Sequence, residues 1–173
     1  MKLTSMIRLS TVQKDGIAAA ITSAVFSGVP SSYFIFSKVS SADEGVKEVL
    51  TSIRAIGNFF VQDITNIPLL YAGGVALHLI LSFFYSQILA EILKDKSSWN
   101  ENVVTCFLAS FIIHTLDLVI IPNIYTMPLL NELLDHTGLL PHLCDHIAFG
   151  TTIGITLAIR KYIRINQVRD KSV

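Results

Sequence analysis

The sequence predicts an all-α, polytopic membrane protein: a four-helix transmembrane bundle with an amphipathic helix on its outer side. Hydrophobic residues make up 51% of the 173 residues and charged residues 15%, whereas a soluble domain carries about 25% charged residues. Stretches of about 20 apolar residues are long enough to cross the hydrocarbon core of a bilayer. The chain has four of them in what its length indicates is a single domain, at residues 16–36, 67–93, 103–122 and 139–159.

The first span, residues 16–36, is interpreted as a retained helix. Its apolar run is longer than the roughly 7–15 residues of a signal peptide, and no clear cleavage site follows it. Ala20, Ala24 and Gly28 recur at every fourth position, a spacing that lets helices pack closely in lipid. Pro30 predicts a kink near the end of this span.

An amphipathic helix is predicted at about residues 42–60, between the first two spans. Ser41 and Glu44 fit a capping box, in which each satisfies a free N–H group at a helix start. Apolar residues then follow at helical spacing with charged residues on the other face. These apolar residues are Val46, Val49, Leu50, Ile53, Ile56 and Phe60. We expect this helix to lie on the outer membrane surface or to cap the bundle.

The distribution of lysine and arginine predicts that both termini are cytoplasmic. Three of these residues precede the first span, two lie between the second and third spans, and five follow the last, which gives ten on the side of the termini. Three lie between the first and second spans, on the opposite side. Basic residues concentrate on the cytoplasmic side of membrane proteins. The formal net charge of zero provides no general attraction for nucleic acid, so the predicted partner is the lipid bilayer, with a homo- or hetero-oligomer left open.

Ionisable residues inside the apolar segments are the candidate functional residues. Such groups are costly at membrane depth, and they usually face a protein interior and perform a function there. Polar and small residues share one face in the second span, a stripe that includes Gly74, His78 and Tyr85. With the predicted orientation, residues of three spans fall in the outer half of the bilayer, within about 10 Å of one another in depth. These are His78, His114, Asp117 and His146.

The spacing His-x-x-Asp occurs twice, at His114–Asp117 and at His142–Asp145, and residues three apart are neighbours on a helix. His and Asp suit a transition-metal ion, histidines from separate helices can ligate haem, and both residue types can relay protons. The favoured hypothesis is a cluster that binds a metal ion or handles protons. Its first candidate residues are His78, His114, Asp117 and His146, and its second are His142 and Asp145.

A competing hypothesis is a scaffold or interaction subunit, in which the same side chains form hydrogen bonds between helices and stabilise the bundle. An enzyme is the third alternative. The chain has no HExxH, no GxSxG and no phosphate-binding glycine loop, so no catalytic residue is assigned.

Three short motifs in the last three spans are similar to those of a known family. They are Gly74-x-x-x-His78, His114 followed by Pro122, and His146-Ile-Ala-Phe-Gly150 leading into Ile159-Arg160-Lys161. In these motifs the chain resembles the small YagU-like inner-membrane family of bacterial proteins. The resemblance implies a bacterial inner-membrane location and little about chemistry. The first span departs from the family pattern, because the expected charged, proline-rich end is reduced to Pro30-Ser31-Ser32.

Overall fold

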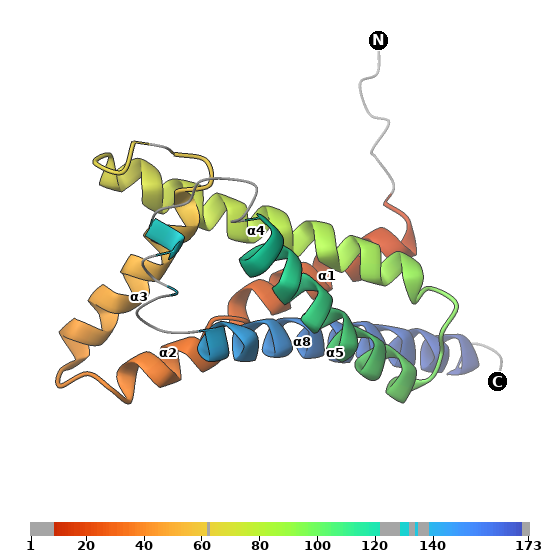
Figure 1. The fold of residues 1–173 in the computed structure, drawn as a ribbon. Helices are drawn as coiled ribbons and strands as arrows, with labels where there is room; N and C mark the ends of the chain where they lie inside the picture. Colours follow the sequence, from red (N-terminus) through yellow and green to blue (C-terminus); the bar gives the residue numbers. More distant parts are fainter. Residues whose placement is uncertain (1–8, 62, 122–128, 132–133, 135–138, 171–173) are drawn as a thin grey trace, which may run out of the picture.

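The computed structural model describes residues 9–61, 63–121, 129–131, 134 and 139–170 (Figure 1). It is 84% helical, and no strand is found among the residues that it describes. The elements are α1 (Thr11–Phe26), α2 (Val29–Phe36), α3 (Ala42–Gly57), α4 (Ile67–Ile92), α5 (Trp99–Thr115), the π-helix η1 (Leu116–Ile120) and α8 (Leu139–Asp170). The all-α prediction is therefore confirmed.

Four helical segments are long and apolar enough to cross a membrane, and they match the four predicted spans. They are Thr11–Phe36, Ile67–Ile92, Trp99–Ile120 and Leu139–Asp170. Only 17–33% of the residues in their most apolar windows are buried inside the protein. Most of their apolar surface therefore faces outward, where only a lipid environment would cover it. The predicted end of the third span, Pro122, lies outside the described residues.

The first span is divided by Pro30 into two helices, where the sequence predicts a kink. Proline stands in the first turn of α2, where its missing N–H removes no hydrogen bond within the helix. The backbone N–H of Ser27 still bonds to the carbonyl of Ser23, so α1 closes normally before the break. Ser10 and Gln13 form a capping box at the other end of α1.

The predicted amphipathic helix is α3. Its cap differs in one detail from the expected box: Ser41 Oγ accepts from the N–H of Glu44 at 3.2 Å, but the Glu44 carboxylate accepts from the N–H of Ser40. Two glycines let the backbones of α3 and α4 touch. A Cβ atom on Gly57 would overlap the carbonyl oxygen of Leu70, and one on Gly74 would overlap that of Ile53. α3 therefore caps the bundle by packing against the first half of α4 (Figure 1).

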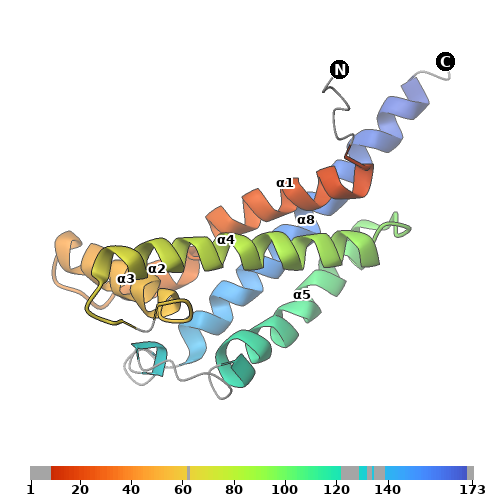
Figure 2. The same cartoon turned by 90° about the horizontal axis from the view of Figure 1, so that it is seen from above.

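The bundle is assembled by contacts of α1 with α4, of α1 with α8 and of α5 with α8. α1 begins, α4 ends, α5 begins and α8 ends at the same end of the molecule (Figures 1 and 2). Glycines of α8 allow the close contact between α5 and α8. A Cβ atom on Gly150 would collide with Ser110 Oγ and with the carbonyl of Cys106, so this pair of helices needs glycine there.

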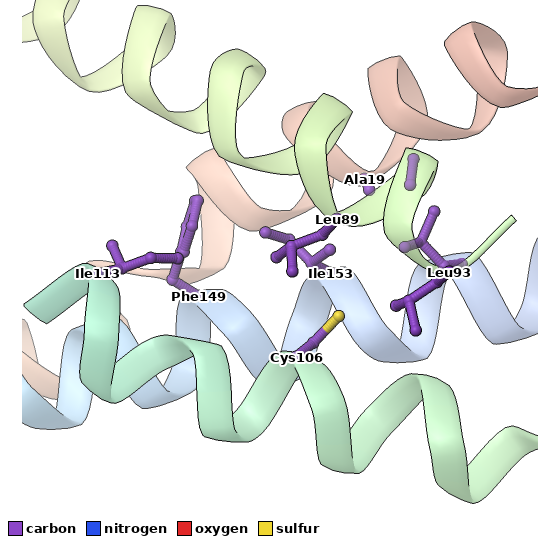
Figure 3. Packing of buried hydrophobic residues seen from close by; sticks show 9 residues of the cluster. Ala19, Leu89, Leu93, Cys106, Ile113, Phe149 and Ile153 are labelled. Carbon is purple, nitrogen blue, oxygen red and sulfur yellow. The ribbon is translucent and has the colours of Figure 1, made fainter.

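The buried apolar cluster lies between α1, α4, α5 and α8 (Figure 3). Its members are Ala19, Leu89, Ala90, Leu93, Cys106, Ile113, Phe149, Ile153 and Leu157. This core occupies the half of the bundle where α4 ends. The other half contains the predicted histidines and aspartates.

Candidate functional site

Three of the predicted residues meet where α5, η1 and α8 come together. Asp117 Oδ2 lies 3.5 Å from His146 Nε2, and the Nδ1 atoms of His114 and His146 are 3.4 Å apart. The two imidazole rings pack edge to face with centroids 5.1 Å apart. The Asp117 and His146 side chains are only 14% and 17% exposed. Residues from two spans therefore form one partly buried polar contact, as their spacing and depth predict.

Tyr85 of α4 extends the cluster to a third span. Its hydroxyl donates a 2.7 Å hydrogen bond to Asp117 Oδ1. Asp117 itself lies in η1, where α5 continues as a π-helix instead of an α-helix. Such π turns occur mostly as short interruptions of helices and are frequent at functional sites. Tyr85, Asp117, His146 and His114 thus form a continuous polar chain across α4, η1, α8 and α5, which we call the His/Asp chain.

The two ring nitrogens of His146 face different polar groups. Nδ1 lies 2.7 Å from the backbone carbonyl oxygen of His142, which can only accept, so Nδ1 carries a hydrogen. Nε2 faces the Asp117 carboxylate. A hydrogen on Nε2 or on the carboxyl group would lie between the two groups. The His146 ring therefore lies between two acceptor groups, the His142 carbonyl oxygen and the Asp117 carboxylate.

The same geometry separates proton binding from metal binding. His114 approaches His146 at Nδ1, whereas Asp117 approaches it at Nε2, on the opposite side of the ring. A single ion cannot be ligated through both nitrogens of one imidazole. Across the described part of the chain, no group of three or more His, Cys, Asp or Glu side chains could hold a metal ion. The metal-binding interpretation of the six candidate residues is therefore unsupported, and haem ligation stays a prediction.

The other first-choice residue, His78, does not contact this chain of side chains. Its Nε2 lies 3.0 Å from the carbonyl oxygen of Ala24 and 3.3 Å from Ser27 Oγ, both at the end of α1. A ring nitrogen that donates to Ala24 ties α4 to α1 just before the break at Pro30. This contact matches the alternative in which a histidine holds two helices together.

The second-choice residues precede His146 on α8, His142 by one turn and Asp145 by one residue. Asp145 Oδ1 accepts a 2.8 Å hydrogen bond from the backbone N–H of Ser31 in the first turn of α2. His142 offers its backbone carbonyl to His146, and its side chain lines the same cavity as Asp145. Both residues therefore adjoin the His/Asp chain, although Asp145 is bonded to a different helix.

A cavity of about 800 Å³ opens beside the His/Asp chain, lined by residues of α1, α2, α3, α4, α5, η1 and α8. Its lining is mainly apolar. The ionisable side chains in it are those of His78, Tyr85, Asp117, His142, Asp145 and His146. Five of the six predicted site residues thus face one space, and His114 reaches it through His146.

A second polar cluster, at the end of the bundle where α1 begins, is absent from the sequence-based prediction. Asp15 is 3% exposed and is bonded to Arg160, at 3.1 Å, and to Arg164. Lys161 is 7% exposed and donates to the backbone carbonyls of Leu93 and Lys96 and to Asn102 Oδ1. The i, i+4 spacing of Arg160 and Arg164 was the available signal, since it places two cations on one helix face.

Comparison with known protein families, characterised proteins and solved structures finds no match to this chain. The fold and its four spans define the class, a multi-pass helical membrane protein. The resemblance to the YagU-like family stays a prediction.

Proposed function

We propose that the protein takes up and releases a proton inside the membrane at the Asp117–His146 pair. The observation that supports this most directly is the position of the His146 ring between two acceptors, the His142 carbonyl oxygen and the Asp117 carboxylate. An imidazole titrates near neutral pH, so it can exchange a proton under physiological conditions. Tyr85 and His114, at the two ends of the His/Asp chain, extend the hydrogen-bonded path on either side of the pair.

The proposed location is a bacterial inner membrane, with both termini cytoplasmic. The excess of basic residues on the side of the termini supports this orientation, and so do the beginning of α1 and the end of α8 at one end of the bundle (Figure 2). In this orientation η1 lies near the outer end of its span, and His146 lies about 10 Å below the outer end of α8. The proton site is then in the outer half of the membrane.

A scaffold function is the second candidate, and His78 and Asp145 are the residues that favour it. Each bonds to a backbone group of another helix, at Ala24 and at Ser31. The two functions divide the predicted residues between them: His78 and Asp145 hold helices together, whereas Asp117, His146 and His114 contact one another through side-chain atoms. We therefore assign proton handling only to the second group.

The test is nitrogen NMR of the protein labelled with ¹⁵N-histidine in lipid nanodiscs, between about pH 5 and pH 8. The signals of His146 are identified by their loss in His146→Gln. The expected result is that Nδ1 stays protonated throughout, while Nε2 or its carboxylate partner exchanges one proton. Asp117→Asn should change this titration, whereas Asn at the exposed loop residue Asp63 should leave it unaltered. A neutral His146 with one fixed tautomer at every pH, together with an Asp117 carboxyl group that keeps one protonation state over the same range, would refute the proposal.

A further inference from the structure

The charges that face the cavity are of one sign. Its lining includes the carboxyl groups of Asp117 and Asp145, and no lysine or arginine is found in the lining formed by the described residues. Three histidines and Tyr85 complete the ionisable set, and a deprotonated histidine or a protonated tyrosine is neutral. When the Asp117–His146 pair releases its proton, the Asp117 carboxylate has no cationic partner. The cavity then holds an uncompensated negative charge among apolar side chains.

An unpaired carboxylate in such surroundings is costly, because apolar side chains do not solvate it as water does. A cation that enters the cavity removes this cost, and a proton that returns to the pair does the same. Four aromatic rings also line the cavity, and the face of an aromatic ring attracts cations. They belong to Phe59, Phe60, Tyr85 and Phe149. Apart from five serines, the remaining lining is aliphatic or glycine, so a bound cation would need a largely apolar body.

We propose that the cavity binds a lipophilic organic cation in competition with the proton of the Asp117–His146 pair. This inference rests on the proposed proton site and names its second ligand. A cavity of about 800 Å³ is within the 300–1,000 Å³ typical of small-molecule sites, so it can hold one cation with several rings. Because both ligands neutralise the same carboxylate, each weakens the binding of the other.

The groups around the pair come from every helix packed against it. Tyr85 of α4 donates to Asp117, His114 of α5 contacts His146, and His142 lies one turn before His146 on α8. His78 of α4 and Asp145 of α8 face the same cavity. The second carboxyl group, Asp145, is bonded to the backbone of α2 and not to either member of the pair.

The probe for the test is tetraphenylphosphonium, whose charge is shielded by four rings and which cannot donate a conventional hydrogen bond. Tetraphenylborate is its matched control, because it has the same shape and the opposite charge. Binding to the purified full-length protein is measured by isothermal titration calorimetry at several values of pH. The expected result is saturable binding of the phosphonium that tightens as the pH rises, by up to about tenfold per pH unit for direct competition with one proton. The borate should not bind.

Two substitutions locate the site. Asp117→Asn should weaken phosphonium binding at high pH at least tenfold and abolish its pH dependence. Asp145→Asn keeps an acceptor for the N–H of Ser31, so it should weaken binding while the pH dependence persists. Asp63→Asn, at an exposed acid outside the spans, should change neither. Circular dichroism and gel filtration of each variant show that it is folded.

The outcomes distinguish this inference from the proton proposal. Titration of His146 in the NMR experiment without phosphonium binding would overturn the cation site and leave the proton site standing. Equal binding of phosphonium and borate would show an apolar cavity without charge selection and would overturn the inference as well. Phosphonium binding that is independent of pH, together with a His146 that does not titrate, would overturn both proposals.

Discussion

The carboxylate of Asp145 on α8 accepts a 2.8 Å hydrogen bond from the backbone N–H of Ser31 on α2. The residue at the N-cap position of α2, Gly28, makes no side-chain hydrogen bond to the helix. The first N–H groups of a helix lack partners within that helix. A side chain of the fourth span therefore performs the capping of a helix in the first span, and it fixes the chain on the far side of the break at Pro30.

Replacement of Asp145 by alanine should lower the free energy of unfolding by about 0.5–2 kcal/mol, the usual cost of a lost N-cap. Asparagine keeps the acceptor oxygen and should cost less than alanine. Thermal unfolding in detergent measures both variants. If alanine and asparagine lower the midpoint equally, the hydrogen bond to Ser31 does not account for the effect.

Substitution of Gly74 by alanine should separate α3 from α4, because the new methyl group would overlap the carbonyl of Ile53. Overpacking of this kind costs about 1–3 kcal/mol. Gly28→Ala is the matched control, since a Cβ atom there meets no atom within 4 Å and its φ of −82° suits alanine. The thermal midpoint should fall for Gly74→Ala and stay near the wild-type value for Gly28→Ala. An unchanged midpoint for Gly74→Ala would contradict the close contact.

The sequence predicts the helices better than it predicts their breaks. Hydrophobic runs are set by the thickness of the bilayer, so all four spans are found close to their predicted positions. A proline permits either a kink or a new helix, and the new helix that forms at Pro30 is capped by Asp145, which is 114 positions from its partner Ser31 in the sequence. The π-helix at Leu116–Ile120 likewise has no local signature in the sequence.

Lys161→Met should destabilise the bundle by about 1–3 kcal/mol, the cost of leaving buried acceptors unsatisfied. Its ammonium group is bonded to the carbonyls of Leu93 and Lys96 and to Asn102, and so it ties the end of α4 and the start of α5 to α8. The effect is measured as a shift in the thermal midpoint. Lys94→Met is the control, because that lysine is exposed and pairs with Glu91, three residues before it in the sequence. If both substitutions lower the thermal midpoint equally, the hydrogen bonds of Lys161 do not contribute specifically to stability.

The loss of stability should depend on which partner of the Asp15 cluster loses its charge. Asp15 is buried, whereas the Arg160 and Arg164 side chains are 43% and 38% exposed. Replacing both arginines by glutamine leaves a buried carboxylate without a cation and should cost about 1–3 kcal/mol, allowing for the exposure of the pair. Asp15→Asn leaves two arginines that water can solvate, and should cost less. Unfolding midpoints of the two variants test this order, and the reverse order would contradict it.

The candidate site was only partly predictable, for a physical reason. Helical spacing places His114 and Asp117 on one face, and span depth brings His146 to their level, so this group could be found from the sequence. Depth alone does not specify which neighbour a side chain faces. His78 turns to the backbone of α1 and Asp145 to that of α2, which divides the predicted set of ligands between separate helix contacts.

The π-helix also determines how an insertion or deletion near Asp117 would change the orientation of the residues that follow. An α-helix turns about 100° with each residue, and a π turn accommodates one residue more than an α turn does. Deletion of a single residue after Asp117, such as Val119, would restore an ordinary α turn and rotate Ile121 by about that angle relative to Asp117. The number of residues in this turn thus determines whether Asp117 and Ile121 both face the cavity. The identity of the apolar residues in the turn matters less.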